Sequence, residues 1–145
     1  MKKISTVLIA FLLATQAAPA RDVITMDAKQ LPLTARNFIY RHFSKPKISF
    51  IKIESEFLSK KYEVMLTNRT KIEFDSNGEW EEVDCKHDTL PVTIVPAHIK
   101  QFVEAQYPGV TYRKIERDRG EVEVELSNRL SLTFNKKGQL IDIDD

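Results

Sequence analysis

Residues Glu63–Asp84 read EVMLTNRTKIEFDSNGEWEEVD, and residues Glu123–Asp144 read EVELSNRLSLTFNKKGQLIDID. At a constant offset of 60 residues, eight of the 22 aligned positions are identical. Most other positions keep their character, as Ile72 and Leu132 do. The stretch therefore predicts that the chain contains a duplicated unit. Because solenoids generally need at least three stacked units, two copies predict one two-lobed body instead.

Both copies alternate apolar and polar residues with a period of two. In the second copy Val122, Val124 and Leu126 are separated by glutamates. This pattern is typical of antiparallel strands with one face on a core and the other face in water. A further strand is expected before each pair of hairpins, at Ile48–Glu54 and Val110–Arg117.

A helix is expected to open each copy. Pro32 and Pro96 fit the first turn of a helix, where the missing N–H of proline costs nothing. Apolar residues then recur at helical spacing as far as Phe43 and Tyr107. The sequence therefore predicts an α+β fold built as a tandem repeat, in which one helix is followed by about four antiparallel strands. Both helices are expected to pack on one side of the sheet, because each sheet has one apolar face to cover.

The N-terminus has the features of a secretory signal peptide. Lys2 and Lys3 precede the apolar run Ile4–Ala14, and Ala18-Pro-Ala20 supplies the small residues that a signal peptidase reads. The run is shorter than the roughly 20 apolar residues of a membrane span, so no membrane anchor is expected. We therefore expect a periplasmic or secreted protein that is cleaved after Ala20. The predicted divisions are a signal peptide at residues 1–20, a leader at 21–30, a first repeat at 31–88, a linker at 89–93 and a second repeat at 94–145.

The charge of the expected mature chain is close to zero. Cleavage removes Lys2 and Lys3, which lowers lysine plus arginine from 22 to 20 against 21 acidic residues, a net charge of −1. This balance provides no field for nucleic acid, so no nucleic-acid partner is expected. Cys85 is the only cysteine, which excludes an intramolecular disulfide.

The order of these elements resembles the PepSY-like family of exported Bacteroidetes proteins, also called β-lactamase-inhibitor-like. The likeness covers nearly all of Leu31–Asp145. The segments that carry it are Tyr62-Glu-Val-Met-Leu-Thr-Asn, Ile72-Glu-Phe-Asp-Ser-Asn-Gly-Glu-Trp-Glu-Glu-Val-Asp-Cys85, Tyr107-Pro-Gly, Glu123-Val-Glu-Leu-Ser-Asn and Phe134-Asn-Lys-Lys-Gly. The resemblance implies an exported tandem repeat with no established catalytic activity. The inhibitor name rests on similarity of shape, so inhibition is an analogy at the level of fold.

The first hairpin of each copy departs from the family pattern. Its turn reads Asn-Arg, at Arg69 and Arg129, where the family usually has Asn-Gly. A two-residue type I′ turn needs positive φ at both central residues, which arginine tolerates poorly. Either the turn is strained or the loop is longer than two residues. The recurrence in both copies also makes the two arginines candidates for contact with a partner.

The sequence contains little that indicates catalysis or a cofactor. It has no glycine-rich phosphate loop, no His-Glu-x-x-His and no Gly-x-Ser-x-Gly motif. Cys85 and His87 could share a metal or form a nucleophile pair, but a structural zinc site needs four ligands and no second pair follows. We expect no enzyme, no cofactor and no metal site, with a small-ligand or metal site near Cys85 and His87 as the alternative.

The acidic residues of the second copy have an ordinary structural explanation, whereas Trp80 has two possible positions, one of which would make it a binding anchor. Glu121, Glu123 and Glu125 are expected to face basic residues of the preceding strand, Arg113, Lys114, Arg117 and Arg119, in cross-strand pairs. On a regular strand Trp80 lies on the wet face or at its rim, whereas a β-bulge would bring it back inside. The sequence leaves open whether Trp80 lies on the wet face or in the core.

The leading hypothesis is an exported, non-enzymatic binding module, inhibitor-like in shape. It would present the polar face of its sheet to a protein or peptide partner in the cell envelope. The candidate binding residues are Met65, Arg69, Lys71, Glu73, Trp80, Glu125, Arg129, Ser131 and Thr133.

Overall fold

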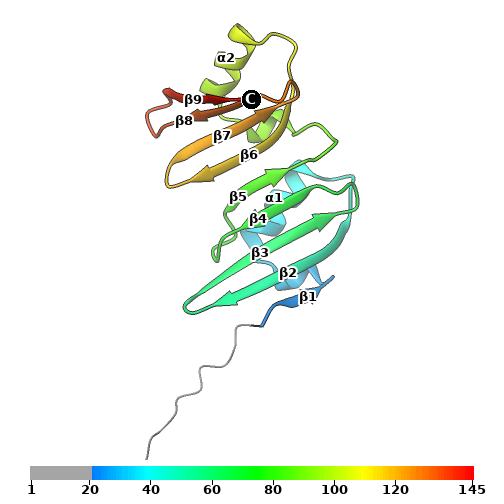
Figure 1. Ribbon diagram of the computed structural model, residues 1–145. Helices are drawn as coiled ribbons and strands as arrows, with labels where there is room; N and C mark the ends of the chain where they lie inside the picture. Colours follow the sequence, from blue (N-terminus) through cyan, green and yellow to red (C-terminus); the bar gives the residue numbers. More distant parts are fainter. Residues whose placement is uncertain (1–20) are drawn as a thin grey trace, which may run out of the picture.

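The computed structural model describes residues 21–145 of the chain, and these residues build one antiparallel sheet of nine strands (Figure 1). The signal peptide predicted at residues 1–20 lies outside the described residues. Each strand pairs with the next one along the chain, so the spatial order equals the sequence order. The strands are β1 (Val23–Thr25), β2 (Ile48–Glu56), β3 (Ser59–Leu66), β4 (Lys71–Phe74), β5 (Trp80–Asp84), β6 (Tyr112–Asp118), β7 (Glu121–Leu126), β8 (Ser131–Phe134) and β9 (Leu140–Asp144).

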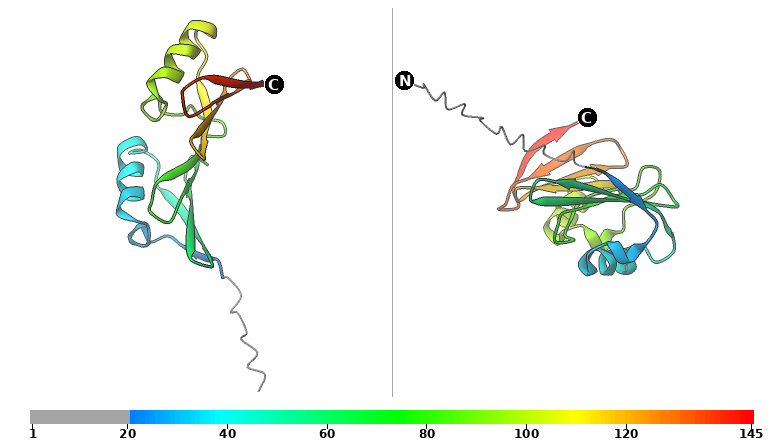
Figure 2. Two further views of the ribbon diagram at one scale, coloured as in Figure 1. Left: turned by 90° about the vertical axis from the view of Figure 1, so that its left-hand side faces the viewer. Right: turned by 90° about the horizontal axis from the view of Figure 1, so that it is seen from below.

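Two α-helices, α1 (Leu33–His42) and α2 (Ala97–Gln106), pack on the same side of the sheet (Figure 2). Each follows a proline, at Pro32 and Pro96, and each is preceded by a short 3₁₀ helix, η1 (Ala28–Gln30) or η2 (Val92–Ile94). The predicted α+β fold with an antiparallel sheet and two helices is confirmed. No helix in residues 21–145 has the length and apolar character that a membrane span requires.

The two helices bury equivalent faces against the sheet. Ala35 of α1 and Ile99 of α2 have no exposed surface. Phe38 of α1 meets Phe74 edge-on with ring centroids 5.7 Å apart, and in the second half the corresponding pair of phenylalanines, on α2 and β8, lies 5.6 Å apart. Edge-to-face contacts of this kind add to the hydrophobic stabilisation of the core.

The predicted alternation of the strands places one row of side chains in this core. The core residues on the strands are almost fully buried: Ile51, Val64, Leu66, Ile72, Phe74, Val83, Ile115, Val124, Leu126, Leu132 and Phe134. The residues between them point to the other face of the sheet, because successive side chains of a strand alternate.

Strands β5 and β6 join the two halves into a continuous sheet. The pairing of Val83 with Ile115 places two buried residues side by side across this junction. Within the halves, Ile72 pairs with Val83 just as Leu132 pairs with Ile143. The order of one helix followed by four strands therefore occurs twice within a single sheet.

Strand β1 was not indicated by the sequence. It lies in the predicted leader and pairs with β2, with Val23 opposite Ile53. Its three residues are too few to show a hydrophobic period, so only the pairing reveals it.

The Asn-Arg hairpins contain three-residue loops. In each, the leucine before the loop donates its N–H to the carbonyl of the residue after it. Arg69 and Arg129 take φ angles of 68° and 73°, in the left-handed region. Such loops commonly place glycine at this position, as the next hairpins do with Gly78 and Gly138. The loop is therefore longer than two residues, as one of the two alternatives predicted. The arginines nevertheless occupy a strained left-handed position in it.

Arg69→Gly and Arg129→Gly should each raise the free energy of unfolding by about 0.5–1 kcal/mol, because glycine reaches this region without a Cβ clash. Thermal melts should show a rise of a few degrees for each variant. Arg69→Ala is the matched control, since it removes the charge but keeps the Cβ. Equal melting temperatures for the glycine and alanine variants would contradict the presence of strain.

Candidate functional site: the open face of the sheet

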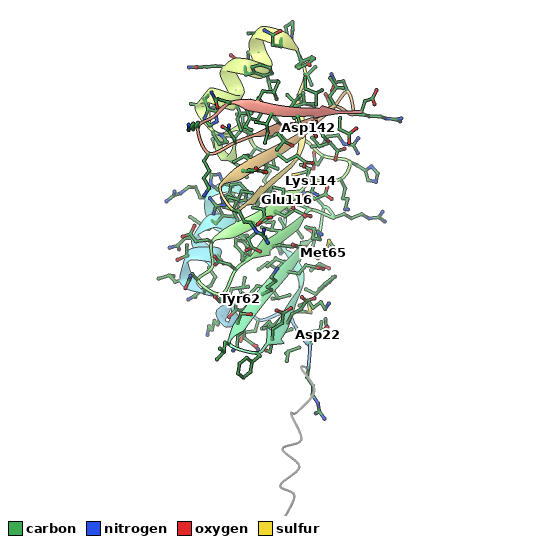
Figure 3. All side chains as sticks on the ribbon, turned by 60° about the vertical axis from the view of Figure 1, so that its left-hand side comes forward. Asp22, Tyr62, Met65, Lys114, Glu116 and Asp142 are labelled. Carbon is green, nitrogen blue, oxygen red and sulfur yellow. The ribbon has the colours of Figure 1, made fainter. Side chains whose placement is uncertain are left out.

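One face of the sheet carries both helices, and no other element of residues 21–145 covers the opposite face (Figure 2). We call this opposite face the open face. Its side chains are those that alternate with the core residues. Figure 3 shows Lys114 and Glu116 on β6, near the middle of the sheet, between Met65 on β3 and Asp142 on β9.

Five glutamates lie directly opposite one another across the open face, one on each strand from β3 to β7. We call them the glutamate row: Glu63, Glu73, Glu82, Glu116 and Glu123. Like charges placed directly opposite in a sheet are destabilising. The row is therefore not explained by the stability of the strand pairs that it crosses.

Two lysines partly neutralise the row. Lys71 Nζ lies 3.0 Å from carboxylate oxygens of both Glu73 and Glu82. Lys114 Nζ lies 3.1 Å from Glu116 and 3.4 Å from Glu82. The side chain of Glu82 is only 13% exposed, so this carboxylate depends on its two lysine partners.

The titration of the two lysines follows from these contacts. Partial burial alone lowers the pKa of Lys71, but hydrogen bonds to Glu82 and Glu73 outweigh burial and raise the pKa above its usual value. The pKa of Lys114 is also raised, because its bonds and charge attraction to Glu116 and Glu82 outweigh the opposing effect of burial. Both lysines therefore remain charged at neutral pH.

The two outer glutamates of the row, Glu63 and Glu123, take part in none of the ion pairs found among residues 21–145. The expected cross-strand pairing of the second-half glutamates is thus largely wrong. Glu123 opposes Glu116, and Glu121 opposes Asp118. Among these three glutamates only Glu125 opposes a cation, Lys114. The open face therefore keeps an excess of negative charge.

Six of the nine candidate binding residues lie on the open face. They are Met65, Lys71, Glu73, Glu125, Ser131 and Thr133. Arg69 and Arg129 lie instead in loops at one end of the sheet and are exposed. The sequence pattern brought the six together correctly, because they belong to the polar positions of regular strands.

Trp80 does not belong to the open face. A bulge between Glu73 and Phe74 changes the register, so that Trp80 pairs with Phe74 and turns toward the helix side. Its ring lies 6.1 Å from that of Phe38, and the guanidinium of Arg117 stacks over it at 4.0 Å. The inclusion of Trp80 among the polar-face residues is therefore corrected, and its half-buried position follows from the bulge.

A cleft of about 410 Å³ lies beside Trp80, between α1 and η2. Its walls include Phe38, Arg41 and His42. The His42 ring nitrogen Nδ1 lies 2.9 Å from the hydroxyl of Thr93 and links the first helix to the second half of the chain. This contact ties α1 to η2 at the junction of the halves.

Cys85 is buried, with 1% of its surface exposed, whereas His87 is exposed. Burial raises the pKa of the Cys85 thiol to about 11, because the charged thiolate is poorly solvated there. Within residues 21–145, no three His, Cys, Asp or Glu side chains are grouped closely enough to hold a metal ion. The arrangement gives no support to a metal or nucleophile site at Cys85 and His87.

The thiol of the folded protein should react very slowly with a thiol reagent at pH 8, since it is both inaccessible and protonated. Unfolding in denaturant should restore one reactive thiol per chain. Absorbance of the released reagent anion measures both, with Cys85→Ser as the blank. Rapid reaction of the folded protein, or a disulfide-linked dimer formed without denaturant, would contradict the buried position.

Sequence reasoning missed the hairpin tip between β2 and β3. Phe57 and Leu58 form this tip, with 92% and 90% of their surfaces exposed. The strand expected at Ile48–Glu54 ends before these residues, and no sequence signal indicated that the hairpin continues to an exposed apolar turn. The glutamate row was missed for a different reason, because it depends on the register of every strand pair that it crosses, including β5 with β6, which are separated in the chain by η2 and α2.

A nine-stranded antiparallel sheet with two helices on one face and a charged open face defines a small helix-backed α+β protein. The chain belongs to the PepSY-like family: the family model described as "Putative beta-lactamase-inhibitor-like, PepSY-like" matches residues 60–142. No curated protein matches the chain.

Solved structures from Bacteroides share both fold and sequence with this chain. One, from Bacteroides thetaiotaomicron, is described as a "putative calcium-regulated periplasmic protein"; it is 50% identical, with a TM-score of 0.81 over 86% of this chain and 97% of that chain. A "putative periplasmic protein" of Bacteroides vulgatus is 40% identical, with a TM-score of 0.80 over 89% of this chain and 99% of that chain. A second protein of that species is 39% identical, with a TM-score of 0.81 over 86% and 100% of the chains.

Proposed function

We propose that the protein is an exported, non-enzymatic binding module whose open face contacts a protein or peptide partner that carries basic side chains. The single observation that carries the proposal is the glutamate row, whose like charges lie directly opposite one another and whose outer members, Glu63 and Glu123, take part in no ion pair within residues 21–145. Residues that reduce stability are commonly retained where function needs them. A basic partner would supply the missing counter-charges and speed association by electrostatic attraction.

The comparisons support the cellular setting of this proposal. The relatives are described as periplasmic, and the inhibitor-like description of the family favours binding over catalysis. We infer that the chain is exported and cleaved after Ala20, so that the mature protein begins at Arg21, which N-terminal sequencing of exported protein would check. We also infer that residues 31–88 and 94–145 arose by duplication of one unit, joined by a linker at 89–93.

A photo-crosslinking amino acid placed at Met65 tests the proposal in the cell that makes the protein. Met65 lies on the open face beside the glutamate row, within reach of anything bound there. Tyr40 is the matched control position, since it is 82% exposed on the outer surface of α1. Light should produce a covalent adduct with a discrete protein from position 65 and none from position 40.

Neutralising the unpaired ends of the row provides a second measurement. The double variant Glu63→Gln, Glu123→Gln should reduce the yield of the adduct from position 65. The same variant should melt at the same or a higher temperature, because it relieves like-charge repulsion. Equal adducts from positions 65 and 40, or an undiminished yield in the double variant, would refute the role of this face.

Calcium-dependent regulation is a second candidate, favoured by the description of the 50% identical relative. Carboxylate oxygens are the ligands that Ca²⁺ prefers, and the glutamate row provides carboxylates on the open face, although no three His, Cys, Asp or Glu side chains of residues 21–145 are grouped closely enough to hold a metal ion. Calcium that binds the folded protein should raise its melting temperature in a concentration-dependent way. Thermal melts in millimolar CaCl₂, in MgCl₂ and in chelator test whether calcium binds the folded protein. Equal melting temperatures in all three solutions would exclude calcium-dependent regulation.

A further inference from the structure

We propose that the tip of the β2–β3 hairpin, Phe57-Leu58, inserts as an apolar anchor into a pocket of the protein partner. This inference rests on the proposed function in one respect, since both require a protein partner. The tip itself is separate from the glutamate row and can be tested separately. We call these two residues the apolar tip.

The apolar tip is the most solvent-exposed apolar feature of residues 21–145. Phe57 is 92% exposed and Leu58 is 90% exposed, and the two are adjacent in the chain. Single exposed apolar side chains are common on protein surfaces. An exposed phenylalanine beside an exposed leucine at the end of a hairpin is a different case, because both can be buried together by one contact.

The backbone of the tip is strained as well. Leu58 takes a φ angle of 67°, a left-handed conformation that is unfavourable for a bulky side chain. The hairpin at the equivalent place in the second half turns at Arg119 and Gly120. That turn shows that this fold accepts a polar, glycine-containing tip at the same place. The fold itself therefore does not require Phe57 or Leu58, which points to a use outside the folded chain.

The hairpin is also long enough to present its tip. Strand β3 begins at Ser59, but β4 pairs with it only from Tyr62 onward. The end of the hairpin thus projects past β4 by about 10 Å, at roughly 3.3 Å per residue (Figure 1). Lys52 on β2 lies opposite Glu63 at the end of the glutamate row. A partner bound on the open face therefore lies within reach of the same hairpin.

The charges near the tip favour a protein pocket over a membrane surface. Glu54 lies opposite Lys61, and Glu56 precedes the tip while Lys60 follows it. Two acidic and two basic side chains cancel, so the hairpin has no excess of positive charge to attract anionic lipids. Apolar anchors surrounded by balanced polar groups are typical of protein interfaces, where an aromatic residue fills a pocket.

The first experiment places the photo-crosslinking amino acid at Phe57 of the full chain, expressed in the cell that makes it. Arg119 is the matched control, because it occupies the equivalent hairpin tip and is exposed. Position 57 should give the same adduct as Met65 of the open face, and position 119 should give none. Absence of an adduct at 57, with the Met65 adduct present, overturns the apolar tip and leaves the proposed function standing. An adduct at position 57 without one at Met65 would refute the role of the open face and leave the apolar tip standing.

The second experiment replaces the tip with a polar turn that has glycine at the one position of positive φ, Phe57→Asn with Leu58→Gly. This variant should melt a few degrees higher, because glycine relieves the strain at position 58. Its Met65 adduct yield should fall by about tenfold or more, the usual effect of losing an aromatic anchor. An unchanged yield overturns the inference. The inference is also overturned if the wild-type protein floats with phosphatidylcholine or phosphatidylglycerol vesicles and the variant does not. That result would assign the tip to a membrane.

Discussion

Replacing Phe74 with alanine should lower the free energy of unfolding by about 3–5 kcal/mol, the usual range for a large buried aromatic residue. Phe74 has no exposed surface and contacts Phe38 edge-on, so its removal leaves a cavity between α1 and the sheet. Denaturant titration followed by circular dichroism measures the change. Tyr40→Ala is the control, because Tyr40 is 82% exposed and should shift the midpoint very little.

The same substitution at Phe134 tests whether the two halves unfold together. Phe134 occupies the equivalent place beneath α2 and is 1% exposed. Since β5 and β6 join the halves through Val83 and Ile115, either variant should shift one common transition. Two separate transitions, with only one displaced in each variant, would show that the shared sheet does not couple the halves.

Gly78→Ala should lower the free energy of unfolding by about 2–3 kcal/mol, through backbone strain and a steric clash together. Gly78 has φ +83°, and a Cβ there would lie 2.8 Å from the Cβ of Pro32 and 3.0 Å from the backbone nitrogen of Ala35. The loop after β4 therefore needs glycine in order to pass under the start of α1. Thermal and denaturant unfolding of the purified variant measure the loss.

Gly109→Ala is a close control for this prediction. Gly109 has φ +81°, but a Cβ there would meet no atom within 4 Å. It should cost only about 1 kcal/mol, the contribution of the left-handed backbone alone. If the two variants lost equal stability, the close approach of the loop to Pro32 would have no energetic effect.

The predictable part of the structure rests on short-range patterns. Alternation with a period of two identified the strands, and Pro32 and Pro96 marked the helix starts, because these signals depend only on neighbouring residues. The six candidate residues on regular strands were placed on the open face for the same reason. Trp80 was uncertain because a bulge reverses the facing of a strand, and its presence depends on the partner strand.

By itself, the sequence determined the α+β class, the two helices and the alternating strands other than β1, since propensity and turn chemistry act locally. Only the tertiary structure decided the glutamate row, because strand pairing brings Glu63 on β3 and Glu123 on β7 into one line across the sheet. It also decided that Cys85 is buried while Phe57 and Leu58 project into solvent. Burial depends on what packs against a residue, and at each of these positions the packing partner lies far away in the chain or is absent from residues 21–145.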